Sequence, residues 1–275
     1  MAIITISREM GSGGIPIAHR AAEKLGYTLV DGEALRKVAS QYGLSQEAFE
    51  AADEHPPAFV AEKDVRLLVD LHLIELMVLD YALKGDVIIY GRGGQDLLKK
   101  IRSVFRVRIT APFEERVERW AEREWLDPDL ARLLVRKSDQ QRAGFIKYYF
   151  DRDWENPLDY DLVINTQRLS EDKAVALICD GVMDQNLVEE KSNSKRILSD
   201  LILSKKAEIA VLKLEDVEGE HLSISAEGGK VTVSGHVHSK NEHKSVLGAI
   251  DNLEDVSAVD DQLQIINYRN EPDEH

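Results

Sequence analysis

The chain has 275 residues, of which 43% are hydrophobic and 31% charged, a composition typical of a folded protein of about two domains. With only 17 Gly and 7 Pro it is neither collagen-like nor wholly disordered. The net charge of −15 disfavours a nucleic-acid partner and anionic lipid, so any phosphate binding needs a local cluster of donors.

Short β-branched runs alternate with helical patterns through residues 1–185. The predicted strands cover 3–7, 28–30, 87–90, 104–110 and 162–165. The predicted helices cover 15–25, 33–42, 59–84, 113–124, 128–150 and 171–184. This alternation predicts an α/β domain whose mostly parallel sheet is covered by helices on both faces.

A second pattern follows residues 186–199, which lack apolar periodicity and predict a linker. Beyond it the elements are expected at 201–214, 222–226, 230–237, 239–253 and 256–266. Their order, αββαβ, predicts a small α+β domain at 200–268 that folds independently of the first. Residues 269–275 form an acidic tail that we expect to fray.

The chain carries no pattern of a secreted or membrane-spanning protein. Its start lacks the basic and apolar regions of a signal peptide. The most hydrophobic stretch, residues 65–83, contains too many polar groups for a bilayer core: Arg66, Asp70, His72, Glu75 and Asp80. The single cysteine, Cys179, cannot form an intramolecular disulfide. We expect a cytoplasmic protein without a transmembrane segment.

Glycines cluster between the first predicted strand and helix. The candidate phosphate-binding residues of this loop are Gly11, Ser12, Gly13 and Gly14. Closely spaced glycines let backbone N–H groups approach a phosphate at a helix N-terminus, although a tight turn without a ligand has the same composition. The full pattern G-x-x-x-x-G-K-[ST] is absent, because Gly14 stands at the lysine position and Ile15 and Pro16 follow it.

Five blocks in one order resemble the cytidylate kinase-like family of P-loop nucleoside monophosphate kinases over about residues 1–184. They are ITISREMGSGG at 4–14, LVD at 29–31, YGRG at 90–93, FRVRITA at 105–111 and YDLVINT at 160–166. The resemblance implies that the first loop binds ATP with Mg²⁺. It also implies that a second site binds a CMP-like or dCMP-like acceptor, to which the γ-phosphoryl group is transferred.

The resemblance also implies an acceptor site after the second and third strands. Asp31 would approach the base or ribose, and Arg36 or Lys37 would face the acceptor phosphate. Arg92 would pair with that phosphate, for which a planar guanidinium is well suited. Alternatively, Asp31 caps the next helix, and Arg36 and Lys37 are solvated surface charges.

By the same resemblance, the charged and aromatic segment 127–153 would be the lid of such a kinase. In it, Arg142 and Arg152 would stabilise the transferring phosphoryl group, although a solvated helix face explains the same charges. Arg8 is a candidate replacement for the missing lysine, and Ser7 or Ser12 could contact Mg²⁺ through water. Two alternatives stay open: a nucleotide-binding sensor that has lost phosphoryl transfer, and an interaction scaffold that binds no nucleotide.

The C-terminal unit resembles a BON domain in GKVTVSGHV at 229–237, the helix at 240–253 and VSAVDDQL at 256–263. This resemblance implies recognition of a phospholipid or another ligand, or contacts with proteins. The acidity of the unit argues against lipid headgroups and favours a regulatory or oligomerising role, with a protein partner, a small ligand or a second copy. His236 and His238 lie two apart on a predicted strand and could begin a metal site. Spacing supplies no third ligand, and a solvated polar face explains the pair more simply.

Overall fold

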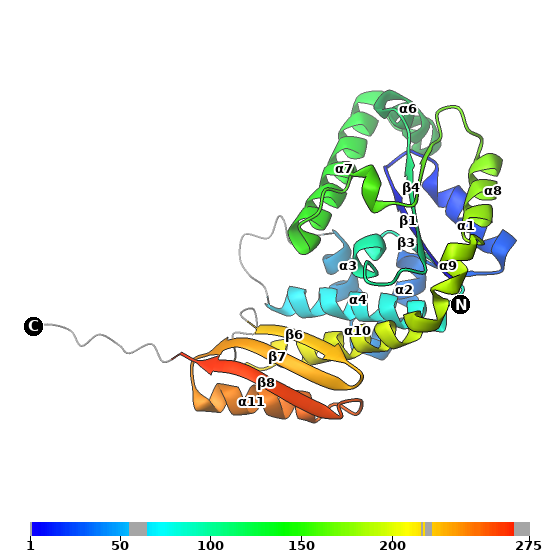
Figure 1. Ribbon diagram of the computed structural model, residues 1–275. Coiled ribbons are helices and arrows are strands. Elements are labelled where there is room, and N and C mark those ends of the chain that lie inside the picture. Colours follow the sequence, from blue (N-terminus) through cyan, green and yellow to red (C-terminus); the bar gives the residue numbers. More distant parts are fainter. Residues whose placement is uncertain (1, 55–64, 216, 218–221, 267–275) are drawn as a thin grey trace, which may run out of the picture.

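A five-stranded parallel sheet forms the centre of the first unit, in the order β2-β3-β1-β4-β5 (Figure 1). The computed structural model describes residues 2–54, 65–215, 217 and 222–266. The strands are β1 (Ile3–Arg8), β2 (Thr28–Val30), β3 (Val87–Tyr90), β4 (Val104–Thr110) and β5 (Leu162–Asn165). They agree with the predicted strands to within one residue.

Helices cover both faces of this sheet, because alternate strand residues point to opposite sides. Ile3 packs into one buried cluster, whereas Ile4 and Ile6 pack into the other. On the side of Ile4 lie α1 (Gly14–Leu25) and α8 (Glu171–Gly181). On the side of Ile3 lie α2 (Gly32–Val38), η1 (Ala39–Tyr42), α3 (Gln46–Glu54), α4 (Val65–Lys84) and α5 (Gly94–Leu97). The part of the predicted helix 59–84 that precedes α4 lies outside the described residues.

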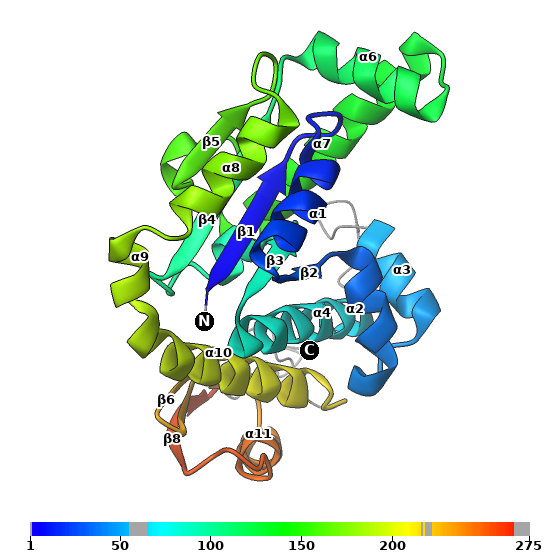
Figure 2. The ribbon, with the colours of Figure 1, turned by 90° about the vertical axis from the view of Figure 1, so that its right-hand side faces the viewer.

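Two helices form a hairpin beyond the carboxyl end of β4 (Figure 2). They are α6 (Phe113–Glu124) and α7 (Pro128–Phe150). They share a small apolar cluster of their own, consisting of Val117, Ala121, Ala131 and Val135. The outer part of the hairpin is thus packed on its own cluster, whereas the second half of α7, which belongs to the predicted lid, packs against the main core through Phe145 and Tyr149.

The predicted linker 186–199 is helical. It contains most of α9 (Gln185–Glu189), and α10 (Lys191–Leu212) runs through the expected domain boundary. Earlier in the chain, a short 3-10 helix, η3 (Pro157–Asp159), precedes β5. One face of α10 packs on α4 through Leu198 and Ile202, and another face packs on the C-terminal sheet through Leu203. The polar run that suggested a linker forms the beginning of a two-sided helix, so the two units share a packed interface.

The C-terminal unit has the expected order αββαβ, with α10 as its first helix. It continues with β6 (Leu222–Glu227), β7 (Lys230–Val237), α11 (Lys240–Asp251) and β8 (Ala258–Ile265). β7 pairs antiparallel with β6 and parallel with β8, and both helices pack on one face of the sheet. The acidic tail 269–275 lies outside the described residues. Among the residues described, none of the helices is both long and apolar enough to cross a bilayer.

Candidate active site

The glycine loop connects β1 to α1 and is shaped by two left-handed glycines. Gly11 has φ +79° and Gly13 has φ +80°, a region that other residues rarely adopt. A Cβ at Gly11 would also collide with the carbonyl oxygen of Arg116. The loop therefore needs glycine at these positions to bring its backbone N–H groups to the start of α1.

Two carboxylates hold this loop in place. The Glu9 carboxylate accepts hydrogen bonds from Arg108 and Thr110 of β4. The Met10 N–H donates to Asp139 of α7 at 2.9 Å. Asp139 also accepts from Arg116 at 2.6 Å, so the loop is tied to the sheet on one side and to the α6–α7 hairpin on the other.

A cavity of about 430 Å³ opens over the loop, and we call it the donor cavity. Ten consecutive residues, from Arg8 to Ile17, contribute to its wall. The wall also includes residues that sequence reasoning missed: Arg119, Trp120, Arg123, Thr166, Leu169, Ser170 and Glu171. Arg119 donates to the Thr166 hydroxyl and carbonyl oxygens, both at 3.1 Å. Arg119 and Arg123 lie four residues apart, a spacing that places both on one face of α6. This signal is present in the sequence, but the many other charges of α6 obscure it.

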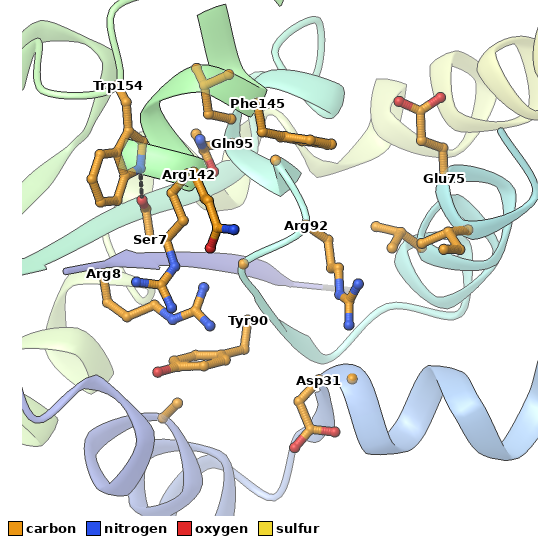
Figure 3. Close-up of a pocket in the computed structure, with 18 of the residues that line it drawn as sticks. Ser7, Arg8, Asp31, Glu75, Tyr90, Arg92, Gln95, Arg142, Phe145 and Trp154 are labelled. Carbon is orange, nitrogen blue, oxygen red and sulfur yellow. Dashed lines mark hydrogen bonds between the residues drawn. The ribbon is translucent and has the colours of Figure 1, made fainter. Parts of the chain in front are cut away.

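A second cavity of about 520 Å³ lies on the other side of Arg8, and we call it the acceptor cavity (Figure 3). Asp31 and Arg92, two of the predicted acceptor residues, line it. The Asp31 carboxylate also accepts from the Ala34 N–H at 2.9 Å, so this residue caps α2 and faces the cavity. Arg92 has φ +60°, and its guanidinium lies 5.4 Å from the centroid of the Phe49 ring.

The two cavities meet at a pair of arginines. Arg8 and Arg142 line both cavities, and Figure 3 shows their guanidinium groups close together. Arg8 lies over the Tyr90 ring, 4.1 Å from its centroid. Burial, reinforced by the positive charge of Arg8, lowers the pKa of Arg142 to about 10, which leaves it charged at neutral pH. Because like charges repel, this arrangement favours an anion between the two cavities.

The space above Gly14 explains why a glycine stands at the lysine position. A Cβ at Gly14 would lie 2.9 Å from both Cβ and Cγ of Arg8 and 3.2 Å from the Tyr90 hydroxyl. Unlike Gly11 and Gly13, Gly14 is not among the residues with positive φ. The glycine is therefore required for space, because the Arg8 side chain crosses the region where a side chain from position 14 would begin.

Three predicted cations lie outside both cavity walls. Arg152 forms ion pairs with Asp159 and, at 3.6 Å, with Asp96, so these carboxylates hold it away from the junction. Arg36 lies 3.9 Å from Glu50. Lys37 is exposed and pairs with Glu33, one turn away on α2, at 2.8 Å. Carboxylates thus engage Arg152 and Lys37 outside the cavity walls, whereas Arg36 lies near Arg92, because both guanidinium groups approach the Phe49 ring, at 6.0 and 5.4 Å from its centroid.

The two candidate serines make hydrogen bonds within the protein. The Ser7 hydroxyl accepts from the Trp154 indole at 2.8 Å. The Ser12 hydroxyl is fully buried and donates to the Glu9 carbonyl at 2.7 Å. In the C-terminal unit, the His236 and His238 rings lie 5.7 Å apart. The described residues contain no group of three or more His, Cys, Asp or Glu side chains placed to hold a metal ion.

The fold and the loop define the class of the first unit. A parallel sheet in the order 2-3-1-4-5, with a glycine loop between β1 and α1, is a P-loop kinase-like fold. The chain belongs to the cytidylate kinase-like family, whose sequence model matches residues 3–168. Residues 199–267 match the BON domain.

Individual proteins are similar over the same region. The chain is 32% identical over 185 residues to a cytidylate kinase of Methanopyrus kandleri, covering 64% of this chain and 90% of that protein. It is also 32% identical over 181 residues to a cytidylate kinase of Ignicoccus hospitalis, covering 65% of this chain and 97% of that protein. The crystal structure of an uncharacterized protein from Eubacterium ventriosum shares the fold, with a TM-score of 0.54 at 22% identity, and covers 67% of this chain and 100% of that one.

Proposed function

We propose that this protein transfers the γ-phosphoryl group of ATP to a nucleoside monophosphate, with CMP or dCMP as the acceptor. The observation that carries this proposal is the meeting of the two cavities at Arg8 and Arg142. The relatives named cytidylate kinase support the choice of acceptor. A new bond forms between the γ-phosphorus and an acceptor phosphate oxygen, the bond to the β–γ bridging oxygen breaks, and ADP leaves.

On the donor side, the N–H groups of residues 11–14 would bind the ATP phosphates at the N-terminus of α1. Arg8 would supply the positive charge that a P-loop lysine supplies elsewhere, and Arg142 would approach from the lid helix α7. Both guanidinium groups would offset charge that develops on the transferring group, where a preorganised cation is most effective.

On the acceptor side, Arg92 would pair with the phosphate of the monophosphate and Asp31 would contact its sugar or base. The cavity wall around them is rich in apolar and aromatic side chains, including Phe145, Ile74 and Val78. Such a wall excludes water from the transfer and orients the acceptor.

Mg²⁺ would accompany ATP and neutralise part of the phosphate charge. The hydroxyls of Ser7 and Ser12 do not fit as its ligands, because one accepts an indole N–H and the other is buried against a carbonyl oxygen. The ion would therefore be held by ATP oxygens and water, and we assign no protein ligand to it.

The test is an assay of ADP formation with ATP and Mg²⁺ against CMP, dCMP, UMP and AMP, alongside calorimetric titration of each nucleotide. We expect turnover with CMP or dCMP, and an increase of about tenfold in the acceptor KM for Arg92→Ala because a charged hydrogen bond is lost. Binding without turnover would replace the kinase proposal with a nucleotide sensor. Absence of both binding and turnover would favour a scaffold.

A further inference from the structure

The acceptor cavity has a polar end that the phosphate-binding residues do not explain. Glu75 of α4 lines the cavity and lies apart from Arg8 and Arg142, beyond Arg92 in Figure 3. Tyr149 of α7 lines the same cavity. Its buried hydroxyl has no hydrogen-bond partner among the residues that the structure describes. Such an unsatisfied hydroxyl is costly unless a ligand pairs with it.

Glu75 and Tyr149 act on each other electrostatically. Burial, together with the negative charge of Glu75, raises the pKa of the Tyr149 hydroxyl above its ordinary value. The hydroxyl therefore stays protonated and can donate as well as accept. In a cavity wall that also contains the apolar side chains of Leu71, Ile74 and Val78, the carboxylate and the neutral phenol form a small hydrogen-bonding site, of the kind that gives a cavity its specificity.

The Glu75 carboxylate is held by a residue of the C-terminal domain. Lys205 of α10 lies with its Nζ 2.7 Å from Glu75 Oε2, and the two side chains are only 14% and 15% exposed. The same Nζ contacts Glu208 at 2.6 Å, and Glu208 lies 3.2 Å from His72 Nδ1. Burial alone would lower the pKa of Lys205, but the two carboxylates outweigh it and raise that pKa, so the lysine is charged.

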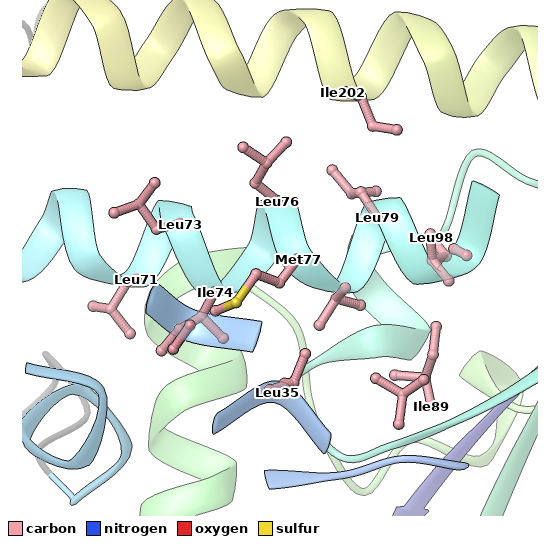
Figure 4. Packing of buried hydrophobic residues seen from close by; sticks show 14 of the residues in the cluster. Leu35, Leu71, Leu73, Ile74, Leu76, Met77, Leu79, Ile89, Leu98 and Ile202 are labelled. Atoms are coloured by element: carbon pink, nitrogen blue, oxygen red, sulfur yellow. The ribbon is translucent and has the colours of Figure 1, made fainter. Parts of the chain in front are cut away.

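The packing around this ion pair fixes its geometry. Figure 4 shows α4 between α10 and the interior of the first unit, with Leu76 and Leu79 directed toward α10 and Met77 directed away from it. Ile202 of α10 reaches toward α4 from the other side. The position of Lys205 is therefore set by an apolar interface, and removal of its charge would leave a largely buried carboxylate uncompensated.

We propose that Glu75 and Tyr149 contact the base of the acceptor, and that Lys205 is a positioning residue that the C-terminal domain supplies to this site. The inference rests on the proposed function and deepens it. The ion pair engages Oε2, and a carboxylate can still accept through its second oxygen, as from the exocyclic amino group of cytosine. Uracil presents a carbonyl oxygen there, which a carboxylate rejects.

The test compares full-length variants in steady-state assays with CMP and UMP. Glu75→Gln should reduce the preference for CMP over UMP by at least about tenfold, because an amide can donate as well as accept. Lys205→Met should raise the CMP KM about tenfold and leave the ATP KM unchanged, and Lys205→Arg should restore most of the loss. The matched control is Lys206→Met, because Lys206 pairs with Asp255 within the C-terminal domain.

A purely structural role for Lys205 would lower Tm and the active fraction without changing the CMP KM or the CMP preference, and that result would overturn the inference. If Lys205→Met does not fold, Glu75→Gln combined with Lys205→Met removes both charges and should fold with the same loss of preference. A double variant that keeps the wild-type preference contradicts the proposal. Absence of wild-type turnover with every nucleotide rejects the proposed function instead.

Discussion

The donor and acceptor cavities differ in how the chain builds them. Ten consecutive residues, 8–17, contribute to the wall of the donor cavity. The acceptor cavity combines strand ends with residues from α2, α4 and α7, and its Glu75 is held by a lysine of the second domain. A site made mainly by one loop is visible as a motif, whereas a site made by packing is not. Variants that affect one cavity, both cavities or neither test this difference.

Arg8→Ala should have the largest effect, because Arg8 belongs to both cavities. We expect kcat to fall by about 10³-fold, equivalent to about 4 kcal/mol of transition-state stabilisation, as for other arginines that act on a transferring phosphoryl group. Arg102→Ala is the control, since Arg102 is exposed and its nearest carboxylate is Glu190 at 3.3 Å. An unchanged kcat for Arg8→Ala would show that another cation replaces the lysine.

Ile202→Ala tests how much the interface between the two units, on which the position of Lys205 depends, contributes to stability. Ile202 is buried between α10 and α4, so its truncation should lower the free energy of unfolding by about 2–4 kcal/mol in chemical denaturation. Val188→Ala, at an exposed position of α9, should change it by less than about 0.5 kcal/mol. A similarly small change for Ile202→Ala would mean that the two units are only loosely associated.

Gly14→Ala tests the spatial relation between the loop and Arg8. The added methyl group would lie 2.9 Å from two carbons of the Arg8 side chain and displace it, which should lower kcat by about tenfold, or about 1.4 kcal/mol. The control is Gly248→Ala, because a Cβ at Gly248 meets no atom within 4 Å. The double variant Gly14→Ala with Arg8→Ala should have the same kcat as Arg8→Ala alone, because the side chain that Gly14→Ala displaces is then absent. If the two reductions in kcat multiply instead, the result contradicts the proposed contact.

Lys37→Ala should have the smallest effect. Lys37 is exposed and pairs with Glu33, one turn away on its own helix, and such surface pairs contribute little. We expect the CMP KM to change by less than about twofold, in contrast to Arg92→Ala. An increase in the CMP KM as large as that expected for Arg92→Ala would show that Lys37 contacts the acceptor after all.

Sequence reasoning succeeded where a signal is local. The strands of the sheet, the glycine loop and the order αββαβ all follow from apolar periodicity and turn residues within a few positions. It failed at residues 186–199, where a polar run indicated a linker although the following residues make α10 a two-sided helix. It also missed Arg119 and Arg123, because α6 contains many charges and only packing shows which of them face the donor cavity.

By itself, the sequence determined the kind of fold, the family and the loop at which phosphate binding is expected, because these depend on residue order and on the backbone freedom of glycine. Only the tertiary structure decided which cations meet. It placed Arg8 and Arg142 where the two cavities meet, and it paired Arg152 with two carboxylates. It also brought Lys205 of the C-terminal domain into contact with Glu75 of the first domain. The physical reason is that the effect of a charge depends on its distance from other charges and on its burial, and both are set by packing between distant segments.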